Sequence, residues 1–293
     1  MRIDAALILC AGLGTRMGRV GKELPKPLWP LFQMTLLEYL YHQLKCLNIK
    51  KIFINIHHRP QMIQEFVQQK GLDIEILEEK ELLGSGGAIH NLLKKTEKDF
   101  NLMTINSDLV LPLEKIKKKI ISSHLESSCA RAYLFPLEVT SPDYAALVKD
   151  KNDRLVDIQK ELYKKRFITY SGVGVIRTKG LKRVFGVSSF FETVCDYKNE
   201  VVILSDFIFK DFFDLGELEK YFLSLFKISQ SSRFHGLVSE GQNFFKDIEK
   251  PGVYKVKILE SDFLIHKKPL AQRCIEVSIT YDGVSSRKIS LQL

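Results

Sequence analysis

The chain has 293 residues, of which 45% are hydrophobic and 27% are charged, a composition usual for a globular protein. No apolar run approaches the roughly 20 residues that a membrane span needs, so we expect no membrane association. The cysteines lack metal-binding spacing and their number is odd, which predicts a reducing, cytoplasmic environment. The formal net charge of +9 indicates a lysine-rich surface that attracts polyanions such as nucleotides, whereas scattered lysines without interleaved aromatic residues disfavour nucleic acid.

Strand and helix patterns alternate through the first half of the chain. Continuous apolar runs predict strands that are buried on both faces, and apolar residues three or four apart predict helices. The predicted strands are Ala5–Leu9, Lys51–Ile56, Asp73–Leu77 and Leu102–Ile105, and the predicted helices are Leu36–Leu47, Pro60–Gln69 and Gly87–Lys95. This alternation predicts an α/β, Rossmann-like fold with a mixed, mainly parallel sheet and helices on both faces.

The second half of the chain has a different texture, with strands joined by short connections. These strands are expected at Ala130–Phe135, Ala146–Lys149, Arg154–Ile158 and Ser171–Ile176, followed by a mixed helix and strand pattern over Val201–Phe213 and a helix over Leu218–Phe226. Further strands are expected at Val253–Ile258, Phe263–His266, Cys274–Tyr281 and Lys288–Leu293. We therefore expect one domain over residues 1–230 and a small β-rich C-terminal extension over residues 231–293.

A glycine-rich segment after the first predicted strand carries the strongest chemical signal. Gly12 and Gly14 permit unusual backbone conformations and let a phosphate approach the backbone amides. Arg16 can form paired hydrogen bonds to phosphate oxygens, and Lys26 is a point charge between two prolines. A dinucleotide-binding loop would need glycine where Met17 stands, and no Gly-Lys-Ser/Thr of a P-loop follows. The segment therefore predicts a triphosphate-binding loop.

The stretch Leu9–Gly18, with Pro25-Lys26-Pro27 after it, resembles the signature of the sugar-1-phosphate nucleotidyltransferases. Residues Glu81–Ile89 are similar to an element of the mannose- and heptose-1-phosphate guanylyltransferases and of the N-acetylmuramate-1-phosphate uridylyltransferases. Asn106-Ser-Asp108 resembles the metal motif of the family, and Phe213-Asp-Leu-Gly216 its late aspartate motif. The resemblance covers about residues 3–228.

This resemblance implies transfer of a nucleotidyl group from an NTP to a sugar 1-phosphate, with release of pyrophosphate. It implies Arg16, Lys26 and Asp108 as catalytic residues, and Asp108 and Asp214 as ligands of a Mg²⁺ cofactor. Asp108 also follows a predicted strand, where α/β sheets bind ligands. The implied nucleotide-binding residues are Leu9, Ala11, Gly12, Gly14, Thr15, Glu79, Gly84, Gly86 and Gly87. The implied sugar-phosphate-binding residues are Lys160, Ser171 and Gly172.

The identities of the base and the acceptor are less constrained. Glu79 stands near the position that reads the base edge, and its carboxylate favours GTP over UTP because guanine offers two donors on one edge. Gln159 and Ser171 depart from the glutamate and asparagine of the family, which leaves the sugar open. Two alternatives remain, a cytidylyltransferase acting on choline phosphate and a non-catalytic nucleotide-binding regulatory protein. Besides the NTP and the sugar 1-phosphate, a second copy of the chain in a homodimer is an expected partner.

Overall fold

The computed structural model describes residues 3–32, 34–96, 99–117, 129–160 and 166–229, together with six strands between Lys246 and Gln292. The chain forms two compact units. The first unit contains Met1–Gly12 and Leu40–Phe212, and the second contains Leu13–Tyr39 and Phe213–Leu293. The chain passes from one unit to the other inside the glycine-rich loop. The predicted domain boundary near residue 230 falls outside the described residues.

The first unit is built on a seven-stranded sheet with the strand order β12-β8-β11-β6-β1-β4-β5. Strand β1 pairs in parallel with β4 and β6, β4 pairs in parallel with β5, and β8 pairs in parallel with β12. Strand β11 runs antiparallel to both β6 and β8. The predicted α/β fold with a mixed, mainly parallel sheet is confirmed. The strand bounds are β1 Ala5–Leu9, β4 Lys51–Ile56, β5 Glu75–Glu78, β6 Asn101–Asn106, β8 Ala132–Val139, β11 Phe167–Arg177 and β12 Val202–Leu204.

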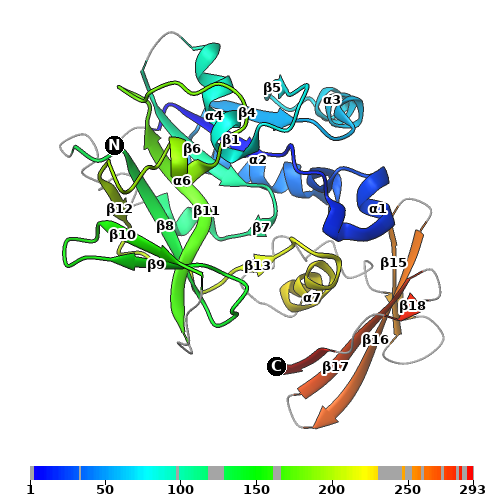
Figure 1. Ribbon diagram of the computed structural model, residues 1–293. Helices are drawn as coiled ribbons and strands as arrows, with labels where there is room; N and C mark the ends of the chain where they lie inside the picture. Colours follow the sequence, from blue (N-terminus) through cyan, green and yellow to red (C-terminus); the bar gives the residue numbers. More distant parts are fainter. Residues whose placement is uncertain are drawn as a thin grey trace. The chain divides into compact units, whose positions relative to one another are not determined.

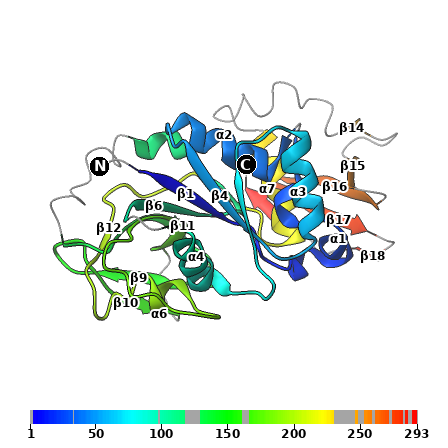
Figure 2. The same ribbon diagram turned by 90° about the horizontal axis from the view of Figure 1, so that it is seen from above.

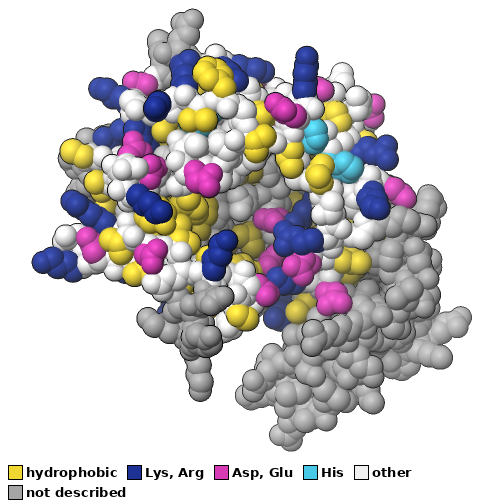
Figure 3. All heavy atoms as spheres, in the orientation of Figure 1, with side chains coloured by type: hydrophobic (Ala, Val, Ile, Leu, Met, Phe, Trp, Pro, Cys, Tyr) yellow, Lys and Arg dark blue, Asp and Glu magenta, His cyan; other side chains and the backbone are white. Residues whose placement is uncertain are grey.

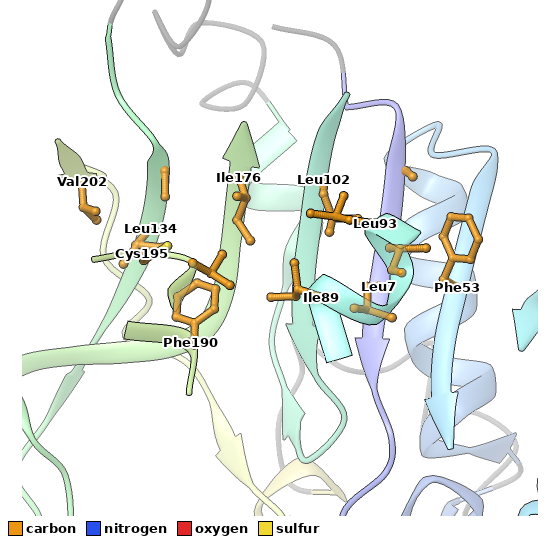
Figure 4. Close-up of a cluster of buried hydrophobic side chains, with 14 of the residues drawn as sticks. Leu7, Phe53, Ile89, Leu93, Leu102, Leu134, Ile176, Phe190, Cys195 and Val202 are labelled. Carbon is orange, nitrogen blue, oxygen red and sulfur yellow. The ribbon is translucent and has the colours of Figure 1, made fainter. Parts of the chain in front are cut away.

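Helices cover both faces of this sheet (Figures 1 and 2). Helix α4 (Gly84–Lys94) lies on one face, and α2 (Leu36–Cys46) and α3 (Pro60–Gln69) lie on the other. Figure 4 shows the buried cluster under α4, in which apolar side chains of the helix pack on those of several strands. Because side chains alternate along a strand, neighbours of Leu7 such as Ile8 face the opposite helices. The labelled members of this cluster are Leu7, Phe53, Ile89, Leu93, Leu102, Leu134, Ile176, Phe190, Cys195 and Val202.

Most predicted elements are present, and two differences are informative. Helix α4 begins at Gly84, three residues before the predicted start. The segment Gly84–Gly87 therefore forms the first turn of the helix. Glycine is a poor helix former, and contacts with another segment stabilise this turn. The predicted helical pattern over 201–213 is wrong, since this segment holds β12 and the start of β13 (Phe213–Asp214). Short elements complete the first unit: β7 Leu109–Val110, a 3-10 turn at Leu113–Ile116, the antiparallel pair β9 Ala146–Lys149 and β10 Leu155–Gln159, and α6 Phe190–Thr193.

The second unit joins segments from both ends of the chain. Its described elements are two 3-10 turns at Thr15–Met17 and Lys26–Leu28, α1 Gly18–Glu23, the hairpin β2 Pro30–Leu31 and β3 Met34–Thr35, the first residues of α2, β13, and α7 Leu218–Ser229. Six further strands form an antiparallel sheet. They are β14 Lys246–Asp247, β15 Val253–Ile258, β16 Ser261–Ala271, β17 Cys274–Tyr281, β18 Val284–Ser285 and β19 Ile289–Gln292.

Helix α2 begins with a capping box, which is encoded by the local sequence Thr35-Leu-Leu-Glu38. The backbone N–H of Glu38 donates to Oγ1 of Thr35 at 3.2 Å, and the N–H of Thr35 donates to Oε2 of Glu38 at 2.8 Å. These reciprocal bonds satisfy two backbone donors that a helix start leaves without an intrahelical partner. The segment after Pro27 is therefore directed into α2 by its own side chains.

Charged side chains of both signs are distributed over the surface. On the face drawn in Figure 3, lysines and arginines lie among aspartates and glutamates and do not form one continuous patch. None of the helices in the described residues has the length and apolar character required to cross a membrane.

A buried arginine ties three segments of the first unit together. The Nε and Nη2 atoms of Arg131 donate to the two carboxylate oxygens of Glu200, each at 2.8 Å, and Nη1 donates to the carbonyls of Arg177 and Lys179. The Arg131 side chain is only 10% exposed. Removing one partner of such a pair costs far more than breaking a surface ion pair, because it leaves the buried guanidinium without a counterion.

We expect Glu200→Gln to lower the free energy of unfolding by about 2–4 kcal/mol, since the Arg131 guanidinium loses its counterion. Chemical denaturation measures this change. The matched control is Asp153→Asn, which breaks the exposed Lys149–Asp153 ion pair and is expected to cost less than about 1 kcal/mol. Equal effects of the two substitutions would contradict the assignment of Arg131 as a buried clamp.

Candidate active site

The glycine-rich loop turns sharply at Gly14. This residue has a φ of +63°, in the left-handed region that favours glycine, and its carbonyl accepts the N–H of Met17 at 2.8 Å. A Cβ on Gly21 would lie 2.4 Å from the Gly14 carbonyl oxygen, so the loop and α1 approach each other too closely for a larger residue. A Cβ on Gly12 would meet nothing within 4 Å. Gly14 therefore shapes the loop, whereas Gly12 leaves its backbone open to a ligand.

Four charged side chains form one network in the second unit. Nη1 of Arg16 lies 3.3 Å from Oε1 of Glu217, and Nζ of Lys220 lies 3.6 Å from the same oxygen. Lys220 also lies 3.4 Å from Oδ2 of Asp214, whose Oδ1 accepts the N–H of Gly216 at 2.7 Å. The structure thus joins the predicted phosphate-binding arginine to the predicted metal-binding Asp214. Arg16 is 65% exposed, so it can exchange its partner at small cost.

The Pro25-Lys26-Pro27-Leu28 segment is anchored to α7. It forms a 3-10 turn in which Lys26 is 9% exposed, and the indole N–H of Trp29 donates to the carbonyl of Leu24 at 3.1 Å. The Trp29 ring packs edge-on against Tyr221 at a centroid distance of 4.9 Å, and the Tyr221 hydroxyl donates to the carbonyl of Pro30. These buried contacts hold the predicted catalytic lysine and the helix after the late aspartate motif in one unit.

The Asn106-Ser-Asp108 motif lies at the carboxyl end of β6, as its sequence position predicts. Its neighbour on β11 is a bulge at Ser171 and Gly172, where the pairing with β8 shifts register. Gly172 has a φ of +78°, and a Cβ there would lie 2.6 Å from the Asn106 side chain. The Ser171 hydroxyl is buried, donates to the carbonyl of Phe135 and accepts the N–H of Val173. The structure therefore brings the predicted metal motif and part of the predicted sugar site together.

Glu79 occupies a buried position just beyond β5. Its side chain receives hydrogen bonds from Nδ2 of Asn55 at 2.9 Å and from the N–H of Leu83 at 3.2 Å, and the residue is 4% exposed. Oδ1 of Asn55 in turn accepts the N–H of Cys10 at 2.9 Å. Burial raises the pKa of the Glu79 carboxyl, and the hydrogen bonds from Asn55 and Leu83 partly offset this increase. Both carboxylate oxygens thus already accept hydrogen bonds from the protein.

The glycines at the start of α4 pack against the loop 186–189. The N–H groups of Gly86 and Gly87 donate to the carbonyl of Ser188 at 3.0 and 3.3 Å. Cβ atoms on Gly84, Gly86 and Gly87 would lie 2.5–2.7 Å from backbone oxygens of this loop. The helix terminus is therefore capped by a protein carbonyl, and the small residues admit a neighbouring backbone.

The other predicted site residues lie at the ends of strands or in the turn that follows. Ala11 is buried after β1, Thr15 is exposed in the first 3-10 turn, and Leu9 is half-buried at the end of β1. Lys160 is exposed beyond β10, and residues 161–165 after it are outside the described residues.

Sequence reasoning missed several residues that the structure brings to these segments. Asn55 lies in a predicted strand to which no chemical role is assigned, although an asparagine in the apolar run Lys51–Ile56 is an unusual polar residue in a buried strand. Glu217 follows the late aspartate motif without an assigned chemical role, and Lys220 carries no signal beyond helical spacing. The loop 186–189 has no chemical motif, and its contact with α4 follows from the fold alone.

Comparisons with known proteins show which proteins the sequence resembles. Residues 6–146 match the MobA-like NTP transferase domain family. The D-glycero-alpha-D-manno-heptose 1-phosphate guanylyltransferase of Campylobacter jejuni is 27% identical over 222 residues, which cover 74% of this chain and 96% of that protein. The enzyme of the same name from Aneurinibacillus thermoaerophilus is 27% identical over 254 residues, with 85% and 95% covered.

Solved structures give the same result for the fold. HddC from Yersinia pseudotuberculosis, complexed with GMP-PN, matches with a TM-score of 0.64 and 25% identity, and the match covers 77% of this chain and 99% of HddC. The inositol-1-phosphate CTP transferase from T. maritima shares the fold with a TM-score of 0.63 at 17% identity, covering 81% and 96%. The glycine-rich loop, the mainly parallel sheet and these relatives agree with the family match, so residues 6–146 belong to a MobA-like NTP transferase domain, and the chain is an enzyme of the nucleotidyltransferase class.

Proposed function

We propose that this protein transfers a guanylyl group from GTP to a sugar 1-phosphate, forming a GDP-sugar and pyrophosphate. The observation that carries the proposal is the charge network of the second unit, which connects the cation after the glycine-rich loop, Arg16, with the carboxylate of Asp214. The two guanylyltransferase relatives support GTP, and UTP is the second candidate.

The reaction needs charge stabilisation more than proton transfer. A phosphate oxygen of the sugar 1-phosphate attacks the α-phosphorus of GTP, and the bond from that phosphorus to the bridging oxygen of the β-phosphate breaks, so that pyrophosphate leaves. The attacking oxygen is already anionic, because the second pKa of a phosphate monoester is about 6. Arg16 and Lys26 would bind the triphosphate and neutralise charge on the departing pyrophosphate, while the amides near Gly12 contact phosphate oxygens.

Carboxylates of Asp108 and Asp214 would hold a Mg²⁺ ion. Within the described residues, no group of three or more His, Cys, Asp or Glu side chains could hold a metal. This fits Mg²⁺, because that ion is commonly held by one or two carboxylates plus substrate phosphates. When bound, it would supply Lewis-acid polarisation of the α-phosphate. Asp214 contacts Lys220 through Oδ2 and the N–H of Gly216 through Oδ1. On metal binding, Oδ2 would exchange Lys220 for the ion.

The sugar 1-phosphate would bind near the bulge of β11. The Ser171 hydroxyl already bonds within the protein, so the backbone around Gly172 is the surface offered to the sugar, with Lys160 as a partner for its phosphate. The names of the two relatives make D-glycero-α-D-manno-heptose 1-phosphate the first acceptor to test.

The proposal is tested in two steps with the full chain. Thermal-shift titration of GTP, UTP, CTP and dTTP with Mg²⁺ identifies the nucleotide, because binding to the folded state raises its apparent stability. Pyrophosphate release is then measured with that nucleotide and heptose, mannose or N-acetylmuramate 1-phosphate, and with choline phosphate. We expect GTP and a sugar 1-phosphate to give product. Release with CTP and choline phosphate alone would instead show cytidylyl transfer.

We expect Asp108→Asn to lower kcat by at least about 100-fold. The variant lacks a carboxylate that would hold Mg²⁺ at the reacting α-phosphate. Steady-state pyrophosphate release measures this loss, and an unchanged melting temperature shows that the fold persists. Asp99→Asn is the matched control, since Asp99 is exposed near the opposite end of β6. A variant of Asp108 with wild-type kcat would remove this residue from the mechanism.

Glu217→Gln should tighten GTP binding about two- to fivefold at low salt, because Arg16 and Lys220 no longer pair with a carboxylate that competes with phosphate. The gain should shrink as salt rises, since these side chains are exposed and screened. Calorimetric titration at two salt concentrations measures both effects. Glu219→Gln, in the first turn of α7, is the control and should leave the affinity unchanged. Weaker GTP binding by the Glu217 variant would contradict this competition.

A further inference from the structure

The loop after β11 carries the two most exposed large apolar side chains among the described residues. Phe185 and Val187 are 74% and 70% exposed, and they stand on either side of Gly186. Gly186 has a φ of +84°, in the left-handed region that favours glycine, so the chain bends between them. A single exposed apolar side chain is common on a protein surface, whereas two at one narrow bend are unusual. We refer to residues 185–187 as the apolar tip.

Contacts with helix α4 and the residue before it hold the apolar tip in place. The N–H of Ser188 donates to the carbonyl of Leu83 at 2.9 Å, and the carbonyl of Ser188 accepts the N–H of Gly86 at 3.0 Å. The Phe185 ring is contacted from another side, because Nζ of Lys94 lies 4.8 Å from the ring centroid. The exposure of the tip is therefore a property of the folded chain, which presents both apolar groups at a defined place.

The two segments beside the apolar tip carry positive charge only. Within residues 91–96 and 177–189, every charged residue is a lysine or an arginine. The segments are neighbours in space, because Nη2 of Arg183 lies 3.5 Å from the carbonyl oxygen of Thr96, just beyond α4. The loop and the last turn of α4 thus bring their cations to one surface.

Four of these cations are exposed beside the tip. Arg177 and Lys179 instead line a depression together with Asp4 and Asp99, whose carboxylates partly neutralise them. We refer to the other four as the tip cations, which are Lys94, Lys95, Lys182 and Arg183. The apolar tip and the tip cations form one surface within the first unit.

An anionic lipid bilayer is the partner whose chemistry fits this surface. Its interfacial region accepts phenyl and isopropyl groups, while its headgroups attract ammonium and guanidinium groups at the ends of long side chains. A protein partner fits less well, because a stable interface buries about 800 Å² on each side and the tip is a narrow bend. A nucleic acid would engage the cations through its phosphates and leave the apolar groups in water.

We propose that the apolar tip and the tip cations form a peripheral binding surface for anionic lipid bilayers, in which the Phe185 ring enters the interfacial region. A short apolar insertion or a basic cluster alone binds a bilayer weakly, whereas the two together give reversible attachment. This inference is independent of the proposed function. It differs from the sequence expectation of no membrane association, which rests on the lack of an apolar run that could span a bilayer.

Co-sedimentation of the full chain with vesicles tests the attachment. The vesicles contain either phosphatidylcholine alone or an equimolar mixture of phosphatidylcholine and phosphatidylglycerol. We expect binding to the mixed vesicles only, and weaker binding as salt rises, because screening reduces the attraction of the tip cations. Phe185→Ser should weaken this binding about tenfold and Lys182→Gln about fivefold. The matched controls Val156→Ser and Lys151→Gln, at exposed positions of β10 and the turn before it, should stay within about twofold of wild type.

A tryptophan probe locates the part of the chain that meets the bilayer. The chain has one tryptophan, Trp29, which is 0% exposed, so its emission is a constant background. In Phe185→Trp, we expect added emission that shifts to shorter wavelength on the mixed vesicles and is quenched by lipids brominated in their acyl chains. In the control Val156→Trp, the emission should stay that of an indole in water. Melting temperatures without vesicles identify a variant that fails to fold, and Phe185→Trp, which keeps an aromatic ring, decides the question if Phe185→Ser does not fold.

Three results would overturn the inference. One is a wild-type chain that does not sediment with the mixed vesicles at low salt, which would leave an acidic protein as the partner of the tip. Another is a folded Phe185→Ser variant that binds as tightly as wild type, which would reduce the interaction to the general attraction of a chain with a net charge of +9. The third is a Phe185→Trp variant that sediments with the vesicles while its emission stays unchanged.

Discussion

Parallel pairing of β1 with β4 and β6 is the constraint on which the rest of the first unit depends. It directs the carboxyl ends of these strands to one edge of the sheet. Cys10 after β1, Asn55 near the end of β4 and the Asn106-Ser-Asp108 motif at the end of β6 therefore lie along the same edge. The pairing is stable only because both faces of the sheet are buried, with the cluster under α4 on one side and α2 and α3 on the other. The chemistry at this edge is therefore a consequence of the core.

Burial separates two kinds of polar contact in this protein. The hydrogen bonds of Asn55 and Glu79 are formed in the interior, where an unmatched donor or acceptor is costly, so these groups are held in one arrangement. The Arg16–Glu217 pair is exposed, and water can replace either partner with little change in free energy. The buried contacts are suited to positioning the loops, and the exposed cation is suited to exchanging a carboxylate for a phosphate.

Glycine serves three different purposes in the candidate site. Gly14 adopts a left-handed conformation, and Gly172 combines such a conformation with close contact to Asn106. The glycines of α4 instead admit the backbone of the loop 186–189, whose Ser188 carbonyl caps the helix. A glycine-rich segment therefore does not by itself identify a ligand-binding surface, because the missing side chain can accommodate either a phosphate or another part of the chain.

The sequence by itself determined the strands, most helices, the fold class and the chemical class, because apolar periodicity, the residues Gly12 to Lys26 and the capping box are all local signals. The position of Asp108 at the end of β6 follows from the same kind of signal. Only the tertiary structure decided which side chains meet: Arg16 pairs with Glu217, 201 residues away, and Asn55 links Cys10 to Glu79. Local sequence misplaces the start of α4, because its glycines lack helix propensity and the stabilising loop lies about a hundred residues later. Such contacts depend on which strands become neighbours in the sheet, and local propensity does not determine the strand order.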